Sequence, residues 1–95
     1  MITITRTDSS ITVSGHAGYA PHGQDIVCAA VSTLVQGFLL SVDKLTTDKL
    51  KTHTGAGKAF IEHGNLSDSG KLLVDSFFVA VKMVADEFPD YVRLE

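Results

Sequence analysis

An apolar repeat at helical spacing fixes the largest element of this 95-residue chain. Between Asp25 and Lys44 apolar side chains recur every three or four residues, which gathers them on one face of a helix. The repeating residues are Val27, Ala30, Val31, Leu34, Phe38 and Val42. Asp25 is a favourable N-cap, so we predict a helix that begins at Ile26 and ends near Lys44. Other elements must cover its apolar face.

Two segments before this helix alternate β-branched and polar residues, as half-buried strands do. Ile2 and Ile4 alternate with threonines, and Ile11 and Val13 alternate with Thr12 and a serine. The intervening sequence, Asp8-Ser9-Ser10, is rich in turn-forming side chains. These features predict an antiparallel hairpin.

The second half of the chain repeats this order. Segments 46–54 and 58–63 predict a second hairpin around Gly55-Ala56-Gly57. A second helix follows, capped by Ser67 or Asp68 and stopped by Pro89. Its expected inner stripe consists of Leu73, Phe77, Ala80, Val81 and Val84. Segment 91–94 then predicts a last edge strand.

The second helix carries apolar residues outside this inner stripe. Val74, Phe78 and Val79 make it apolar on several faces, which predicts burial on more than one side. A domain of this size has little core to cover them, so we expect a two-fold subunit interface with Phe78 or Val74 among its contacts.

The order of these elements predicts the fold class. Without internal repeats or linkers, residues 1–95 form a single α+β domain. The economical arrangement is a two-layer sandwich, in which two helices cover one face of a mostly antiparallel sheet of four or five strands.

Composition argues against several function classes. The formal net charge is −3, and no cluster of lysine and arginine forms the basic face typical of proteins that bind nucleic acid directly. No apolar run approaches the ~20 residues of a membrane span. The first residues lack the layout of a secretion signal. We therefore expect a cytoplasmic protein without a membrane segment.

The single cysteine, Cys28, has two possible roles. It would lie in the first turn of the helix capped by Asp25, where free amides and the helix dipole favour a thiolate. The nearby carboxylate of Asp25 would oppose this effect. Alternatively, Cys28 fills space in the core as a small apolar residue. One cysteine excludes an internal disulfide and a cysteine-rich zinc site.

Two histidines in the glycine-rich loop 15–24 are candidate partners for this thiol. His16 follows the second predicted strand, and a strand end and a helix start can face each other across a sheet edge. A thiol and an imidazole in reach of one another form a nucleophile–base pair. His22, in the loop, is the rival base. Ser32 lies one turn after Cys28, where it either orients a ring or water, or bonds back to the preceding turn.

The segment Gly15-His16-Ala17, followed by Gly23-x-Asp25-Ile26-Val27-Cys28-Ala29-Ala30-Val31-Ser32, resembles the signature of the ribosomal-processing cysteine protease family, Prp. The separation of 12 residues between His16 and Cys28 agrees with that family. The resemblance implies a homodimeric cysteine endopeptidase without a cofactor or metal, whose catalytic pair is His16 and Cys28. Its implied substrate is the precursor of a large-subunit ribosomal protein, the twenty-seventh, which loses an N-terminal extension.

The remaining expectations concern the surroundings of this pair. Gly15, Asp25 and Ser32 are expected to support the site or bind substrate, and amides of the first helical turn to stabilise the oxyanion. Two alternatives stay open at this point. One is a ribosome-associated binding module without catalysis, and the other is a zinc site formed by His16, His22, Cys28 and a fourth ligand.

Overall fold

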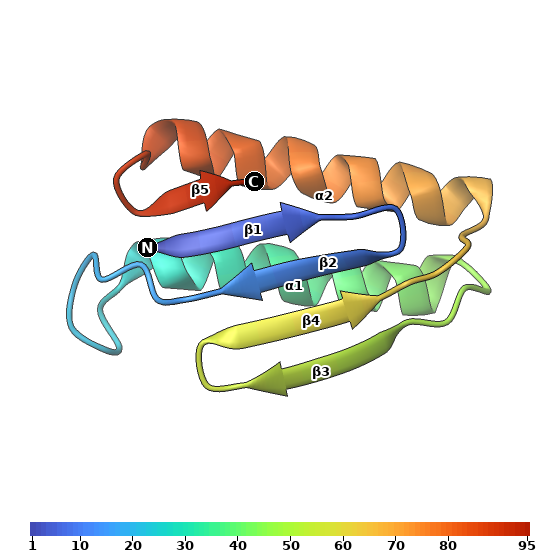
Figure 1. Cartoon of the computed structure of the whole chain (residues 1–95), viewed down its shortest axis with the longest axis horizontal. Coiled ribbons are helices and arrows are strands. Elements are labelled where there is room, and N and C mark those ends of the chain that lie inside the picture. The colour runs from blue at the N-terminus through green and yellow to red at the C-terminus, as the bar shows by residue number, and fades with distance from the viewer.

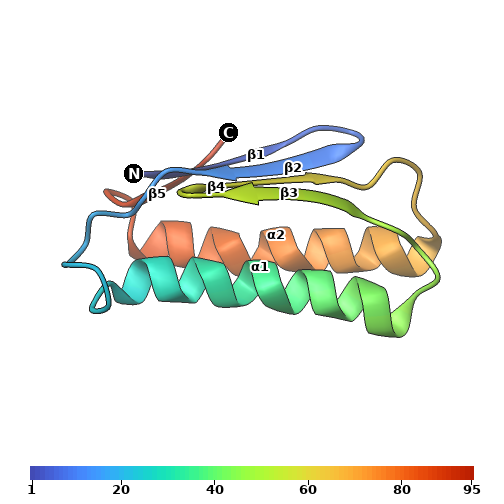
Figure 2. The ribbon, with the colours of Figure 1, turned by 90° about the horizontal axis from the view of Figure 1, so that it is seen from below.

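Seven elements follow one another in the computed structural model, which describes residues 1–95. They are β1 (Ile2–Arg6), β2 (Ser10–Ser14), α1 (Ile26–Leu45), β3 (Lys51–Gly55), β4 (Lys58–Glu62), α2 (Asp68–Glu87) and β5 (Val92–Leu94). Both helices lie on one face of the sheet (Figure 2). The predicted two-layer α+β sandwich is therefore confirmed.

The five strands form one mixed sheet in the order β3-β4-β2-β1-β5. The two hairpins join through β2 and β4, and the pairs β1–β2, β2–β4 and β3–β4 are antiparallel. Only β5 runs parallel to its neighbour, β1, because α2 crosses back over the sheet before it (Figure 1). The predicted last edge strand is thus present, and it is shorter than segment 91–94.

The core lies between this sheet and the two helices. Ile4, Ile11 and Ile61 on the sheet are completely buried. α1 buries Val27, Val31, Val35, Phe38 and Val42. Between the helices, the rings of Phe38 and Phe77 approach to 5.2 Å between centroids. The apolar repeat of α1 therefore packs within the core of the domain itself.

The expectation that no apolar segment approaches the length of a membrane span is wrong for α1. Its 20 residues are long and apolar enough to cross a membrane by length and composition alone. In the fold, however, this helix is one of the two that cover the sheet, and its valine stripe belongs to the core. Because polar residues interrupt α1, the sequence contains no long uninterrupted apolar run there.

The faces of α2 also differ from the prediction. Ser67 is the cap, since its side chain accepts from the Gly70 amide. Val74 was expected at a subunit interface but is buried in the protomer's own core. Phe78 is partly buried, with Arg6 4.7 Å above its ring. The large apolar side chains that α2 exposes are Leu72, Val79 and Met83.

The segment between α1 and β3 is a loop rather than the first half of a strand. β3 begins at Lys51, whereas segment 46–54 was predicted to be extended. The Thr46 hydroxyl donates to the Val42 carbonyl at the end of α1. The Asp48 carboxylate accepts from the amide and the hydroxyl of Ser67. Capping of two helices therefore takes precedence over strand pairing here.

Candidate active site

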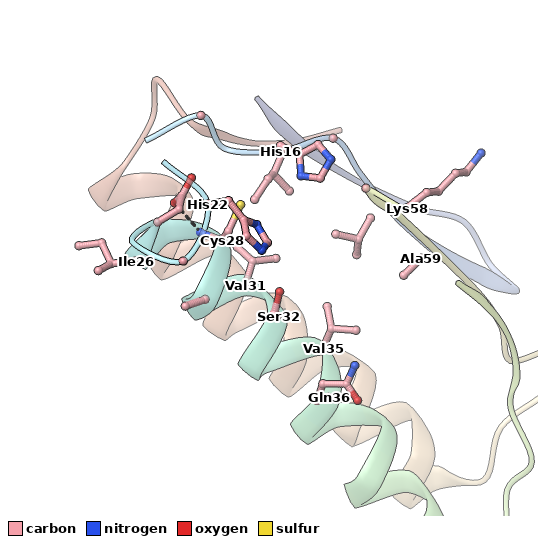
Figure 3. A pocket seen from close by; sticks show the side chains of 18 of the residues that line it. His16, His22, Ile26, Cys28, Val31, Ser32, Val35, Gln36, Lys58 and Ala59 are labelled. Carbon is pink, nitrogen blue, oxygen red and sulfur yellow. Dashed lines mark hydrogen bonds between the residues drawn. The ribbon is translucent and has the colours of Figure 1, made fainter. Parts of the chain in front are cut away.

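A cleft opens at the end of the molecule where β2 ends, α1 begins and β3 turns into β4. Its volume is about 890 Å³. One wall is the first three turns of α1, which contribute Cys28, Ser32 and Gln36 (Figure 3). The opposite wall is the turn between β3 and β4 with Lys58 and Ala59. The cleft is open enough to admit an extended chain.

Cys28 lies in the first turn of α1 and lines this cleft. Its side chain is partly buried, and the amide of Ala17 donates to Sγ at 3.3 Å. Ala17 itself is almost fully buried, so this amide is held in place by packing. Cys28 is thus neither a pure core residue nor fully exposed.

Asp25 caps α1 and ties the loop to it. One oxygen accepts from the amides of Val27 at 3.1 Å and Cys28 at 2.9 Å, and the other accepts from Tyr19 at 3.0 Å. The amide of Cys28 is the largest cause that holds the pKa of Asp25 below its usual 3.8; the amides of Tyr19 and Ala20 add to it, and desolvation opposes them. The predicted N-cap is confirmed, and the carboxylate is occupied by backbone groups.

The same hydrogen bonds bear on the backbone donors that were expected for the oxyanion. Amides of the first helical turn were expected to stabilise it. In the structure the amides of Val27 and Cys28 bind the Asp25 side chain, and the Ala29 amide donates to the Asp25 carbonyl. The Ala17 amide is the backbone donor that points at the sulfur instead.

His16 has a fixed backbone and an exposed ring. The Met1 nitrogen donates to its carbonyl at 2.6 Å, and the preceding Gly15 amide donates to the Gly57 carbonyl at 2.7 Å. Gly15 has φ of +94°, and a Cβ there would collide with the Met1 carbonyl, so glycine is required. The imidazole lines the cleft with Cys28 but forms no hydrogen bond with it or with any other protein group.

His22 and Ser32 line the same cleft. His22 is exposed in the loop, and its ring makes no hydrogen bond. Ser32 lies one turn after Cys28, and its hydroxyl is also free of protein partners. The bond back to the preceding turn, considered for Ser32, is made by Thr33 to the Ala29 carbonyl at 2.8 Å. The structure thus brings both histidines and Ser32 to the thiol's cleft.

The zinc alternative lacks a ligand set. No three side chains among histidine, cysteine, aspartate and glutamate are arranged to hold a metal ion, and this includes His16, His22 and Cys28.

The second hairpin forms a wall of the cleft that was not predicted from the sequence. Thr54, Gly55, Gly57, Lys58 and Ala59 line the cleft, although the sequence linked this hairpin to no function. The signal was the Gly55-Ala56-Gly57 turn, but nothing local shows which distant element a turn will approach.

The loop between His16 and Cys28 is anchored at Tyr19. Its ring packs edge-on against Phe88 at 5.7 Å and Tyr91 at 5.2 Å between centroids. These partners lie at the end of α2 and just before β5. The loop is therefore attached to the C-terminal part of the fold as well as to Asp25.

A family model and several known proteins match this chain over nearly its whole length. Residues 1–93 match the family model described as "Cysteine protease Prp". The "Ribosomal processing cysteine protease Prp" of Mycoplasma pneumoniae is 30% identical over 97 residues, covering 100% of this chain and 94% of that protein. Its namesake from Bacillus subtilis is 28% identical, with coverage of 90% and 82%.

A solved structure is similar over the whole chain. It is the crystal structure of an essential ribosomal processing protease Prp from S. aureus in complex with a covalently linked product peptide. The TM-score is 0.93 with 26% sequence identity, and the match covers 100% of this chain and 98% of that one.

Proposed function

Because this chain belongs to the cysteine protease Prp family and is a cysteine protease, we propose that Cys28 is its nucleophile and His16 its general base. One observation carries the first assignment: Cys28 is the only cysteine in the chain. A protease of this class needs a thiol, and Cys28 lines an open cleft. The non-catalytic binding module is thereby set aside.

The choice of His16 over His22 is supported by the backbone. His16 is held by hydrogen bonds on both of its sides, and the Ala17 amide next to it donates to the sulfur. His22 follows Pro21 in a loop segment without comparable anchoring. A general base must return to one position in every cycle, which favours the fixed residue.

The proposed reaction is acyl transfer to the thiol followed by hydrolysis. His16 removes the proton of Cys28, the thiolate attacks the peptide carbonyl, and His16 then protonates the leaving amine. Water attacks the thioester with His16 again as base, which releases the acid and regenerates the thiol. The Ala17 amide lies beside the sulfur, so it is our candidate donor to the oxyanion.

Supporting roles follow from the contacts. Asp25 holds the helix start and the loop together and is not free to orient the imidazole. Gly15 allows the backbone of the second strand to pass close to Met1, which brings His16 to the cleft. The free hydroxyl of Ser32 is available to a substrate or to a water in the cleft.

We infer that the substrate is the precursor of the twenty-seventh large-subunit ribosomal protein, which loses an N-terminal extension. The names of the relatives refer to ribosomal processing, and the S. aureus neighbour holds a product peptide. The reaction is then cytoplasmic and involves no direct contact with nucleic acid. A net charge of −3 is consistent with a protein rather than a nucleic acid as the substrate.

Cleavage of the extended ribosomal protein tests this proposal. Wild-type protein should release the extension as a separate peptide in mass spectrometry. Cys28→Ala should abolish the product while the thermal unfolding midpoint changes little, because the side chain is only partly buried. A folded Cys28→Ala protein that still trims the precursor would exclude Cys28 as nucleophile.

A further inference from the structure

The turn between β3 and β4 contacts the ring of His16 at a glycine. Gly57 has φ of +69°. A Cβ placed on Gly57 would lie 2.6 Å from Nε2 of His16, 3.2 Å from Cδ2 and 3.3 Å from Cε1. Carbon and nitrogen atoms do not approach so closely without a bond, so the ring occupies the space that any side chain at position 57 would need.

The ring has no other fixed support inside the protein. Neither of its nitrogens hydrogen-bonds to a protein group, and Asp25, a carboxylate in the same cleft, is engaged by three backbone amides. A carboxylate that orients the base, as in many hydrolytic triads, is therefore not available from Asp25. Contact with the hairpin turn takes the place of such a bond.

The backbone links the same two segments. The Gly15 amide donates to the Gly57 carbonyl at 2.7 Å, so the residue before His16 is bonded to the residue that its ring touches. The same residue of the hairpin, Gly57, therefore contacts the His16 ring and binds the backbone next to it. The neighbouring residues Gly55 and Ala56 do not touch the ring in this way. A Cβ on Gly55 would meet open space, and Ala56 already carries a Cβ.

We propose that Gly57 is a positioning residue for the catalytic base: the missing side chain at this turn sets where the His16 imidazole stands relative to Cys28. This proposal rests on the proposed Cys28–His16 pair. The second hairpin then does more than form a wall of the cleft, because it determines the geometry of proton transfer without contributing a catalytic group.

Gly57→Ala tests this role, and Gly64→Ala is its matched control. Both glycines have left-handed backbones, with φ of +69° and +57°, but a Cβ on Gly64 would meet nothing within 4 Å. Backbone strain is therefore similar, and only position 57 adds the collision. We expect Gly57→Ala to lower kcat for the ribosomal precursor on the order of ten- to a hundred-fold with a smaller change in KM. Gly64→Ala should keep the wild-type kcat.

The alkylation rate of Cys28 with iodoacetamide, measured against pH, separates positioning from general damage. Gly57→Ala should change this profile in the wild-type background. It should have no further effect in a His16→Ala background, since two residues that act through one contact are non-additive. Equal effects of Gly57→Ala in both backgrounds would overturn the proposal, as would an equal loss of kcat in Gly64→Ala.

A measurement on the unaltered protein covers the case in which Gly57→Ala fails to fold. Proton NMR of the wild type should show cross-relaxation between the ring protons of His16 and the α-protons of Gly57, and its absence would overturn the proposal. Failure of the catalytic pair is distinguishable: normal cleavage by His16→Ala would exclude the pair, whereas inactive His16→Ala beside fully active Gly57→Ala would exclude only the role of Gly57.

Discussion

At the scale of single residues, the site depends on backbone groups more than on side-chain pairs. The thiol receives an amide from Ala17, and the N-cap carboxylate of Asp25 receives three amides. Sequence patterns predicted the N-cap, since Asp25 stands directly before an apolar repeat. They did not predict that the other carboxylate oxygen of Asp25 would accept the Tyr19 amide, because this depends on how the loop turns back towards the helix.

The two histidines of the cleft should contribute unequally. His16→Ala is expected to lower kcat by roughly 10²–10⁴-fold, the usual contribution of a general base. His22→Ala should stay within a few-fold of wild type, because an unanchored loop side chain is not held near the thiol. Steady-state cleavage of the precursor by both variants checks this, and the reverse order of losses would make His22 the base.

Asp25 should make the fold sensitive to acid. Its pKa lies below the usual 3.8 in the folded protein, so the ionised group stabilises the fold above that pH, and this stabilisation is lost as pH falls through the lower folded pKa. Asn also caps helices but does not titrate. The melting temperature of wild type should exceed that of Asp25→Asn at neutral pH, and the difference should begin to shrink near pH 3.8 and disappear at lower pH, where folded Asp25 is protonated. A difference that is constant across this range would contradict the assignment.

At the scale of elements, the loop 15–24 combines fixed and free parts. Its three glycines favour a mobile loop that orders over substrate, whereas packing of Tyr19 on the domain would favour a rigid one. The structure contains that packing and bonds the Tyr19 amide to Asp25. Gly18, His22 and Gly23 have no such hydrogen bonds to the backbone.

Hydrogen exchange should therefore divide the loop. The Tyr19 amide should be protected in the free protein, whereas those of Gly18, His22 and Gly23 should exchange quickly and slow down when a substrate peptide binds to Cys28→Ala. The experiment compares exchange with and without peptide by NMR. Strong protection of all four amides in the free protein, unchanged by peptide, would exclude gating by this loop.

The elements that could be predicted from sequence are those with a strong local period or cap. The helix from Ile26 and the strands around Ile4 and Val13 have such signals, and they are present. The loop at 46–50 was predicted to be a strand because Thr46 and Thr47 suit strands. Asp48 is instead used at the start of α2, a contact 19 residues away that no local pattern contains.

At the scale of the whole molecule, the outer side of α2 is an apolar face that one protomer leaves exposed. Leu72, Val79 and Met83 are 66–73% exposed. We infer that this face joins two copies in a homodimer, as expected from the apolar excess of the helix, though through these residues rather than Val74. Sequence alone could not separate the two sets, since both are apolar and their direction depends on how α2 packs on α1.

Oligomeric state checks this assignment. Val79→Asp should convert a dimer into a folded monomer at micromolar concentration in light scattering, because a carboxylate would be buried without a partner. Ser9→Asp, on the exposed β1–β2 turn, is the control and should remain a dimer. A wild-type protein that is monomeric at this concentration, or a dimeric Val79→Asp, would contradict the proposed interface.

The place of β5 has a consequence for the order in which the molecule is completed. β1 leaves the ribosome well before β5, yet it lies between β2 and β5 in the sheet. The Tyr19 ring likewise can pack only after Phe88 and Tyr91 have been synthesised. While the chain is being synthesised, the segment between His16 and Cys28 therefore has only part of its support until Phe88 and Tyr91 have been made. A nascent chain that already carries its thiol is thus a protease still under assembly.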